Sequence, residues 1–493
     1  MSYQKLEQHQ QQIHRLQHLA AICGWDQATM MPEGGNDARA EAMAELEVLL
    51  HEKQTAPDVG DWIAAAEGES LSPPQQANLH EIRRHWQDAR LLPADLVEAL
   101  SLAGSKCEHA WRRQRKENDW AGFAPNLEEV VRLSREVARL RAEALGVRPY
   151  DAMLALYEPG MSVTRLDQVF GDLATWLPGL ITEVTERQSG AAILTPVGPF
   201  PVEQQKALGL EVMGIIGFDF NHGRLDVSTH PFCGGVPTDV RMTTRYNDDE
   251  FVSSLMGIIH ETGHARYEQG LPRDWLGQPV GEARSMGVHE SQSLFCEMQL
   301  GHHPAFLSLI APHIRTHFGD QPALAPANLE RLYNRIEPGF IRVDADEVTY
   351  PAHVILRYEL ERDLMEGRIE VRDIPELWDQ KMRHWLGIST AGNYRDGCMQ
   401  DIHWTDGSFG YFPSYTLGAM TAAQLRFALE RDLGEMGELI AAGKLPAIFD
   451  WLKQKIWQQA SFLPTDTLMV QATGESLSPH WLRRHLEQRY LGR

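Results

Sequence analysis

Apolar residues recur at helical spacing along most of the chain, and polar residues occupy the opposite faces. Glycine and proline interrupt this pattern at points such as Pro73 and Gly198, where we expect breaks between helices. The spacing predicts helices at residues 3–20, 36–55, 75–91, 93–117, 126–146, 163–188, 201–215, 249–269, 283–300, 327–336, 353–366, 374–386 and 421–442. The fold should therefore be mainly α.

Strand patterns are few and local. Residues 223–228 and 238–246 alternate between polar and apolar or β-branched side chains, and a third short candidate lies at 347–349. The first two come just before the predicted helix 249–269, so we expect one small antiparallel sheet beside that helix. No internal repeat or low-complexity linker divides the chain, and we treat residues 1–493 as a single domain.

The charge balance narrows the classes of partner. The formal net charge is −22, from 68 acidic and 46 basic side chains. It disfavours nucleic acid and anionic membranes, because phosphate binding needs clustered Lys and Arg. No apolar run approaches the roughly 18 residues needed to cross a bilayer, and the polar, Gln-rich N-terminus does not resemble a signal peptide. We expect a cytoplasmic protein.

The cysteines do not predict a disulfide-bonded fold. Five of them lie far apart along the chain, and none forms a Cys-x-x-Cys pair. This spacing argues against a disulfide network and against a thiolate zinc site.

The segment IIHETGHARYEQG contains the pattern His-Glu-x-x-His on the predicted helix 249–269. His260 and His264 are four residues apart, so both imidazoles project from one face of the helix. Two nitrogens at that spacing can reach one zinc ion at about 2.0–2.1 Å. Glu261 points to another side, in a position to act as a general base on water.

A hydrolytic zinc site needs a third protein ligand, which leaves the fourth position for water. The extension typical of metzincins is absent, because Tyr267 and Gly270 stand where Gly and His would be required. We therefore expect a carboxylate from the next helix, where Glu282, Glu290 and Glu297 are available. Glu290 lies mid-helix and needs a partner such as a metal, whereas Glu282 fits a helix start and Glu297 a supporting role. Ligand chemistry alone does not decide among the three.

Further short motifs follow one another along the chain. They are WDQATMMP at 25–32, HPF at 230–232, DVRMT at 239–243, HETGH at 260–264, HESQS at 289–293, IRVDAD at 341–346, GCMQDIHW at 397–404 and GYFPSYTLG at 410–418. With this set in this order, the chain resembles the carboxypeptidase Taq family of zinc metallocarboxypeptidases over most of its length.

The resemblance implies a large helical body with a deep groove and the metal at its floor, similar to neurolysin and angiotensin-converting enzyme. It implies a homodimer that releases single amino acids from peptides with a free C-terminus, with broad specificity and poor action beside proline. His260, His264 and Glu290 would then be the ligands of Zn²⁺, for which Co²⁺ or Mn²⁺ are possible substitutes. Glu261 would be the general base and then the proton donor to the leaving amine.

The oxyanion formed during peptide hydrolysis needs hydrogen-bond donors besides the metal. His403 in the QDIHW segment, with Tyr411 or Tyr415 after it, is the natural source. Related helical zinc peptidases place His and Tyr residues similarly. A packed aromatic ring with a satisfied hydroxyl would explain either tyrosine equally well, so the sequence does not choose between them.

An exopeptidase must also hold the terminal carboxylate, which arginine does through paired hydrogen bonds. Arg342 in IRVDAD is the first choice, with Arg357 and Arg241 behind it. The alternative for Arg342 is an internal ion pair with Asp344 or Asp346.

The predicted strand 238–246 offers a way to bind the substrate backbone by strand addition, which would explain broad specificity. His230 would then line the groove. The competing enzyme function is an oligopeptidase or dipeptidyl carboxypeptidase on the same scaffold. A non-catalytic helical binding protein is a further alternative, which the intact base and ligand set disfavour.

Overall fold

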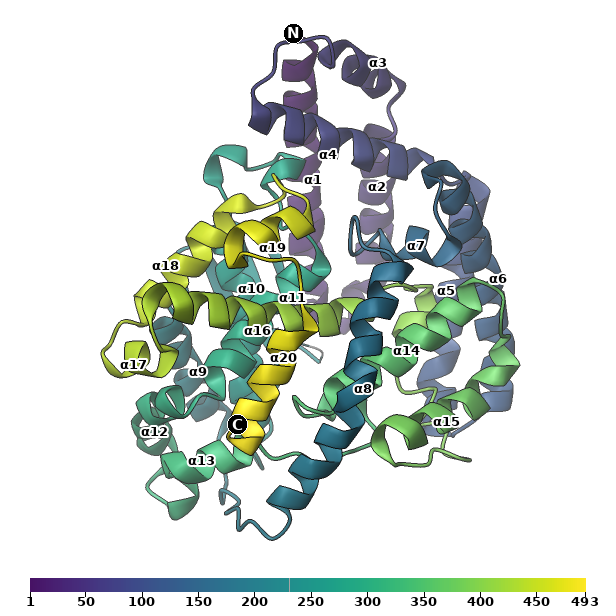
Figure 1. The fold of residues 1–493 in the computed structure, drawn as a ribbon. Helices are drawn as coiled ribbons and strands as arrows, with labels where there is room; N and C mark the ends of the chain where they lie inside the picture. The colour runs from purple at the N-terminus through teal and green to yellow at the C-terminus, as the bar shows by residue number, and fades with distance from the viewer. Residues whose placement is uncertain (230) are drawn as a thin grey trace.

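The computed structural model describes residues 1–229 and 231–493, and its regular structure is almost entirely helical (Figure 1). Every predicted helix has a counterpart, often longer or shifted by a few residues. The counterparts are α1 (Ser2–Thr29), α2 (Asn36–Gln54), α4 (Pro73–Arg90), α5 (Ala94–Lys116), α6 (Trp120–Leu145), α8 (Val163–Gln188), α9 (Val202–Ile216), α10 (Val252–Gly270), α11 (Met286–Leu294), α13 (Pro326–Tyr333), α14 (Tyr350–Met365), α15 (Ile374–Leu386) and α16 (Pro413–Leu433). The predicted helix 421–442 spans the second half of α16 and α17 (Met436–Ala441).

Further helices lie outside the predicted ranges. They are α3 (Pro57–Ala66), α7 (Pro149–Leu154), α12 (Pro304–Phe318), α18 (Leu445–Lys455), α19 (Thr465–Thr473) and α20 (Pro479–Leu486). All but α19 carry a proline at the first or second position. Proline is well tolerated there, because the first N–H groups of a helix have no partner within the helix. Proline therefore marks helix starts in this chain as well as breaks.

The sheet has three strands, β1 (Gly223–Val227), β2 (Cys233–Val236) and β3 (Asp239–Thr244), in the order β1-β3-β2. Strand β1 pairs parallel with β3, and β2 pairs antiparallel with β3. The prediction of an antiparallel sheet was therefore wrong, because the sheet is mixed. Strand β2 escaped detection because its sequence, CGGV, lacks a polar–apolar alternation.

The third predicted strand, at 347–349, was also wrong. These residues form a turn that leads into α14. The carboxylate of Asp346 accepts the backbone N–H groups of Val348 and Thr349, at 3.0 Å and 2.9 Å, so this backbone is held in a turn and not in a ladder.

The predicted pairing of substrate with strand 238–246 does not fit the sheet. That strand is β3, and both of its edges are hydrogen-bonded to other strands. The sheet instead packs on α10 through a small apolar cluster that includes Val240, Met242 and Ile258. The sheet thus lies beside the HETGH helix, as predicted.

Two large apolar cores meet at α16. One core holds residues of α5, α6, α8, α14 and α15, and the other holds residues of α9, α10, α12, α13 and α18. Helix α16 gives Leu417 and Met420 to the first core, and Leu425 and Leu429 to the second. In Figure 1 this helix runs across the middle of the molecule, with α14 and α15 on the right and α12 and α13 on the left. A smaller core joins α1, α3 and α4 at the top.

Glycines let α11 approach its neighbours closely on both sides. A Cβ at Gly263 of α10 would lie 2.3 Å from the carbonyl oxygen of Gln292 and 2.6 Å from Cα of Ser293. A Cβ at Gly418 of α16 would lie 2.8 Å from both Cβ and Cγ of Glu290. Helix α11 is therefore held between α10 and α16 at distances that only glycine permits.

No helix in the described part of the chain combines the length and the apolar character that a membrane span requires. The five cysteines are free thiols, in agreement with the absence of a paired cysteine pattern.

Candidate active site

Three side chains from α10 and α11 converge on one point. Nε2 of His264 lies 3.2 Å from Oε2 of Glu290, and Nε2 of His260 lies 3.8 Å from the same oxygen. One ligand atom from each residue falls within 4.8 Å of the others, and this is the only such group of His, Cys, Asp or Glu found in residues 1–229 and 231–493. Two imidazoles and a carboxylate form a donor set that suits a divalent metal ion.

Neighbouring acceptors hold the rings with Nε2 facing this point. Nδ1 of His260 lies 2.7 Å from Oε2 of Glu297. Nδ1 of His264 lies 2.6 Å from Nδ1 of His289. A hydrogen on Nδ1 of His260, donated to the Glu297 carboxylate, would leave the lone pair on Nε2 free for a metal, and the same tautomer of His264 would pair with His289. The residues present therefore fit a metal ion.

The other two predicted candidates lie elsewhere. Glu297 contacts a histidine of the trio and does not join it, which matches its expected supporting role. Glu282 does not start a helix, because α11 begins at Met286 after Ser285, whose hydroxyl accepts the N–H of Val288 at 3.1 Å. That part of the expectation was wrong.

Burial and opposite charges act against each other within the trio. Burial raises the pKa of Glu290, but His260 and His264 lower it to about 2. Burial lowers the pKa of His264 to about 4, which leaves this ring neutral. For His260, burial lowers the pKa and the Glu290 and Glu297 carboxylates raise it above the ordinary value. The carboxylate of Glu290 is thus kept ionised, as a metal ligand must be.

Glu261 lies outside the trio and is only 8% exposed. Its Oε2 atom is buried without a hydrogen-bond partner among the described residues. Burial raises the pKa of this carboxyl to about 7, in spite of the neighbouring His260. A buried carboxylate oxygen without a partner is an unusual feature that a water molecule or a substrate would satisfy.

The trio opens on a cavity of about 710 Å³. His260 and Glu290 line this cavity together with Arg342, Tyr350 and Tyr415. The candidate metal site and one of the predicted arginines therefore share the same space.

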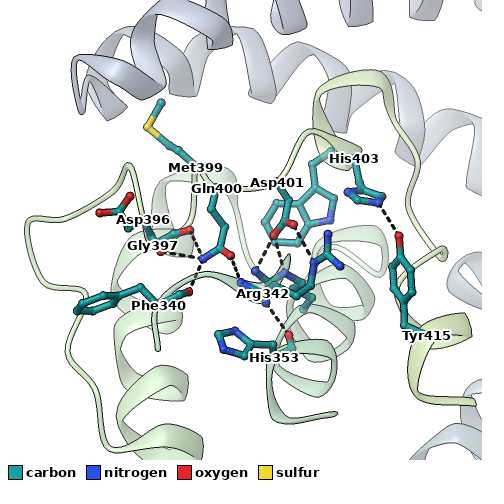
Figure 2. A network of polar contacts seen from close by, with 12 residues as sticks. Phe340, Arg342, His353, Asp396, Gly397, Met399, Gln400, Asp401, His403 and Tyr415 are labelled. Atoms are coloured by element: carbon teal, nitrogen blue, oxygen red, sulfur yellow. Dashed lines mark hydrogen bonds and ion pairs between the residues drawn. The ribbon is translucent and has the colours of Figure 1, made fainter. Parts of the chain in front are cut away.

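Arg342 is held by residues from distant parts of the chain (Figure 2). Its Nε donates to Oδ1 of Asp401 at 2.9 Å, and its Nη1 donates to the hydroxyl of Tyr350 at 2.7 Å. Its backbone N–H donates to the side chain of Gln400 at 2.7 Å. The expected partner for an internal ion pair was Asp344 or Asp346, and this was wrong because Asp401 occupies that position.

The other two predicted arginines do not line the cavity. Arg357 is fully buried and its Nε donates to Oδ2 of Asp401 at 2.6 Å. Arg241 donates to Asp239 at 2.6 Å and its guanidinium lies 4.5 Å from the ring centre of Trp25. Arg245, just after β3, does line the cavity, and sequence reasoning missed it.

His403 and the two tyrosines do come together, as Figure 2 shows for His403 and Tyr415. Nε2 of His403 lies 3.3 Å from the hydroxyl of Tyr415, and the rings of Tyr411 and Tyr415 are 5.3 Å apart. Of the three, Tyr415 lines the cavity. Burial lowers the pKa of His403 to about 4 and raises that of Tyr415 well above its usual range, so both are neutral at pH 7.

Two further residues of this site were not predicted from the sequence, and one predicted residue lies outside the described part of the chain. Asp401 stands in the GCMQDIHW motif, yet only its contact with two arginines reveals its importance. Tyr350 follows the IRVDAD motif closely, but nothing in the sequence pattern marks its contact with Arg342. His230, which was expected to line the groove, lies outside the described residues.

Comparisons with known proteins agree with this geometry. Residues 5–490 match the model of the family described as carboxypeptidase Taq (M32) metallopeptidase. Thermostable carboxypeptidase 1 of Thermus thermophilus is 38% identical over 507 residues, which cover 99% of this chain and 98% of that protein.

Solved structures are similar over the same extent. Metallocarboxypeptidase 1 of Trypanosoma cruzi superposes with a TM-score of 0.98 at 49% identity and covers 99% of both chains. A carboxypeptidase of Pyrococcus furiosus gives a TM-score of 0.94 at 31% identity, again with 99% of both chains covered. The chain therefore belongs to the carboxypeptidase Taq (M32) family of metallopeptidases and is a metallocarboxypeptidase.

Proposed function

We propose that this enzyme releases single amino acids from the free C-terminus of peptides, with His260, His264 and Glu290 as metal ligands. The observation that carries the proposal is that His260, Glu290 and Arg342 line one cavity. An exopeptidase needs both a metal site and a cationic group for the terminal carboxylate within the length of one residue. Zn²⁺ is the proposed metal, because two His and one Glu form a common ligand set of catalytic zinc. Co²⁺ or Mn²⁺ would suit the same ligands.

Glu261 acts as the general base in this proposal. Bound zinc would lower the pKa of a water molecule to about 7 and polarise the scissile carbonyl. The unpartnered Oε2 of Glu261 takes the proton of the attacking water. The same carboxyl group then passes this proton to the nitrogen of the leaving amino acid, so that no charge is left on the amine.

Arg342 binds the terminal carboxylate. Asp401 and Tyr350 fix the plane of its guanidinium group, and its remaining N–H groups are available to the substrate. A fixed guanidinium loses little freedom on binding, which favours paired hydrogen bonds to a carboxylate.

Tyr415 donates a hydrogen bond to the oxyanion, with His403 behind it. Its hydroxyl lies 3.3 Å from Nε2 of His403, which holds the phenol in place while it faces the cavity. Because the pKa of Tyr415 is raised by burial, its hydroxyl keeps the hydrogen that it has to donate. Tyr411 packs against Tyr415 and supports it.

Specificity and organisation complete the proposal. We propose broad tolerance for the terminal side chain and poor cleavage beside proline, whose ring fixes φ and removes the N–H of the scissile bond. The family resemblance supports one catalytic domain over residues 1–493 and a homodimer. Free cysteines fit a reducing compartment such as the cytoplasm.

Mass spectrometry tests this function directly. A mixed-sequence peptide pool is incubated with the zinc-loaded enzyme, and the products are followed over time. We expect a ladder that loses one C-terminal residue at a time and stalls next to proline. Paired losses would indicate a dipeptidyl carboxypeptidase, and internal cuts would indicate an oligopeptidase; either result would overturn the proposal.

A further inference from the structure

The two histidines of the trio are supported in different ways. Nδ1 of His260 meets a carboxylate directly, at 2.7 Å from Glu297. Nδ1 of His264 meets another histidine, with 2.6 Å between the Nδ1 atoms of His264 and His289. Two ring nitrogens at this distance share one hydrogen, so one of them donates and the other accepts.

The proposed metal ligation decides the direction of this bond. Nε2 of His264 faces Glu290 and keeps its lone pair for the metal, so Nδ1 of the same ring carries the hydrogen. Nδ1 of His289 then accepts, and the hydrogen of that neutral ring sits on Nε2. This Nε2 lies 2.8 Å from Oε1 of Glu268, an acceptor. Only this arrangement pairs each donor with an acceptor in the series of hydrogen bonds that runs from His264 through His289 to Glu268.

Each of the two helices of the metal site thus supplies a ligand and a support. Glu268 follows His264 by four residues on α10, which puts both on the same face. His289 directly precedes Glu290 on α11. Its ring packs against His264 at 4.7 Å and against Tyr267 at 5.3 Å between ring centres, so its orientation is fixed.

We propose that His289 and Glu268 are positioning residues that hold His264 in the metal-binding tautomer. The inference rests on the proposed metal ligands. The carboxylate of Glu268 stabilises the hydrogen on Nε2 of His289. This makes Nδ1 of His289 a better acceptor for His264. Supporting residues of this kind typically change metal affinity about 10–100-fold.

The surroundings of the pair allow a clean test. Neither His289 nor Glu268 lines the 710 Å³ cavity that holds Arg342. Glu268 borders a separate cavity of about 300 Å³, together with His18 of α1 and Val236 of β2. Substitutions at the two positions therefore change the support of the metal ligand without changing the lining of the proposed substrate site.

The experiment compares variants of the full-length enzyme in a chelator competition assay with Zn²⁺. His289→Phe keeps a ring of similar size but removes both hydrogen bonds, and it should weaken Zn²⁺ binding about 10–100-fold. Glu268→Gln keeps an oxygen acceptor without the charge and should weaken binding less. The visible spectrum of the Co²⁺-loaded protein should also change in His289→Phe, because a reoriented His264 alters the ligand geometry.

His317→Phe is the matched control. His317 lies 3.1 Å from Glu211, and its side chain is 15% exposed, against 19% for His289, but this pair joins α12 to α9 outside the candidate site. It should bind Zn²⁺ as the wild type does. Wild-type affinity and an unchanged Co²⁺ spectrum in both His289→Phe and Glu268→Gln would overturn the inference. If His289→Phe does not fold, Glu268→Gln decides alone.

Ligand variants separate this inference from the proposed function. His264→Ala and Glu290→Ala are measured in the same assay and should lose far more affinity than either supporting variant. If these two bind Zn²⁺ normally, the proposed ligand set is wrong. If they lose the metal while His289→Phe and Glu268→Gln keep full affinity, the ligand set stands and only the positioning role fails.

Discussion

The two walls of the candidate cavity are built in opposite ways. Helices α10 and α11, consecutive along the chain but for short connecting turns, bring together the histidines and Glu290. The other wall takes Arg342, Tyr350 and Tyr415 from separate segments, and Asp401 anchors Arg342. Two short motifs encode the first wall, whereas the second forms only when the IRVDAD and QDIHW segments, α14 and α16 have packed together. This difference separates the chemistry that a motif can encode from the chemistry that needs a complete fold.

The walls also differ in how their charges are satisfied. Asp401 lies between Arg342 and Arg357 and accepts a hydrogen bond from each. On the side of the metal trio, an oxygen of Glu261 is buried without a partner among the described residues. A satisfied network is rigid, whereas a buried carboxylate oxygen without a partner can accept a hydrogen bond from a bound molecule. Under the proposed function, the first group would position the substrate and the second would react with it.

Replacement of the unsatisfied carboxylate should have the largest effect. Glu261→Gln retains the shape but cannot take a proton, and general-base catalysis is typically worth about 10²–10⁴-fold in rate. We expect kcat to fall by that amount while the metal content stays at the wild-type level, because Glu261 lies outside the trio. Peptide turnover and metal analysis on the same sample check this. Unchanged turnover would remove the proposed difference between the walls.

The satisfied wall should respond through stability. Asp401→Asn leaves two buried guanidinium groups without their carboxylate, and breaking such a buried pair costs about 3–5 kcal/mol. Burial raises the pKa of Asp401, but Arg357 and Arg342 hold it well below its usual range. Because the folded state binds this proton less readily than the unfolded state, the stabilisation is complete above about pH 4 and is lost as the pH falls further.

Denaturant unfolding of wild type and Asp401→Asn at several pH values measures this effect. The gap in unfolding free energy should be widest near pH 7 and should narrow below about pH 4, the ordinary range of an aspartic acid. A gap that stays constant down to pH 3 would contradict the assigned charge pairing.

Arg342 should matter for substrate more than for the metal. Arg342→Ala removes the proposed charged partner of the terminal carboxylate. We expect kcat/KM to fall by an amount that corresponds to about 2–5 kcal/mol of lost transition-state stabilisation. The variant should treat a free peptide and its C-terminal amide alike. Arg245→Ala is the control, since Arg245 lines the same cavity, and it should keep the discrimination. If Arg342→Ala still prefers the free acid, another residue binds the carboxylate.

The smallest effect should come from the junction between the walls. Gly418→Ala places a Cβ 2.8 Å from Cβ and Cγ of Glu290, closer than non-bonded carbon atoms can approach, so α11 or α16 has to shift. Overpacking of this kind costs about 1–3 kcal/mol, and we expect lower thermal stability and weaker Zn²⁺ binding. Gly179→Ala in α8 is the control, because no atom lies within 4 Å of the new Cβ, and this variant should keep wild-type Zn²⁺ affinity. If the two variants have the same thermal stability and Zn²⁺ affinity, the close packing at Gly418 does not support the metal site.

Local patterns predicted the helical part of the fold well, since each predicted helix corresponds to one that the structure contains. They failed where pairing decides the outcome. The sheet was expected to be antiparallel, but β1 runs parallel to β3. The sequence of β2 contains two glycines and no alternation, so this strand is recognised only from its pairing with β3. Five of the six helices outside the predicted ranges carry proline at the first or second position, and the same residue also ends helices.

Within the site, prediction followed the same division. The i,i+4 spacing predicted that His260 and His264 share one helix face, and the family resemblance implied Glu290 as their partner. These three side chains converge in the structure. The ion pair of Arg342 was assigned to a neighbour in sequence, whereas Asp401 lies 59 residues away. Nothing in local spacing carries that information, because a contact at such a separation depends on how the IRVDAD and QDIHW segments pack.

The sequence by itself determined the helical class, the position of the two histidines on one helix face, and the family through its ordered motifs. The first two follow from periodicity and spacing, which act over a few residues, whereas the family follows from the resemblance of the motifs to those of a known family. The tertiary structure decided that Glu290 approaches the Nε2 atoms of both histidines while Glu297 contacts Nδ1 of His260. It also decided that Arg342 and not Arg357 reaches the cavity, and that β3 has no free edge. The reason is that burial and long-range packing select one arrangement among several that the local pattern allows equally.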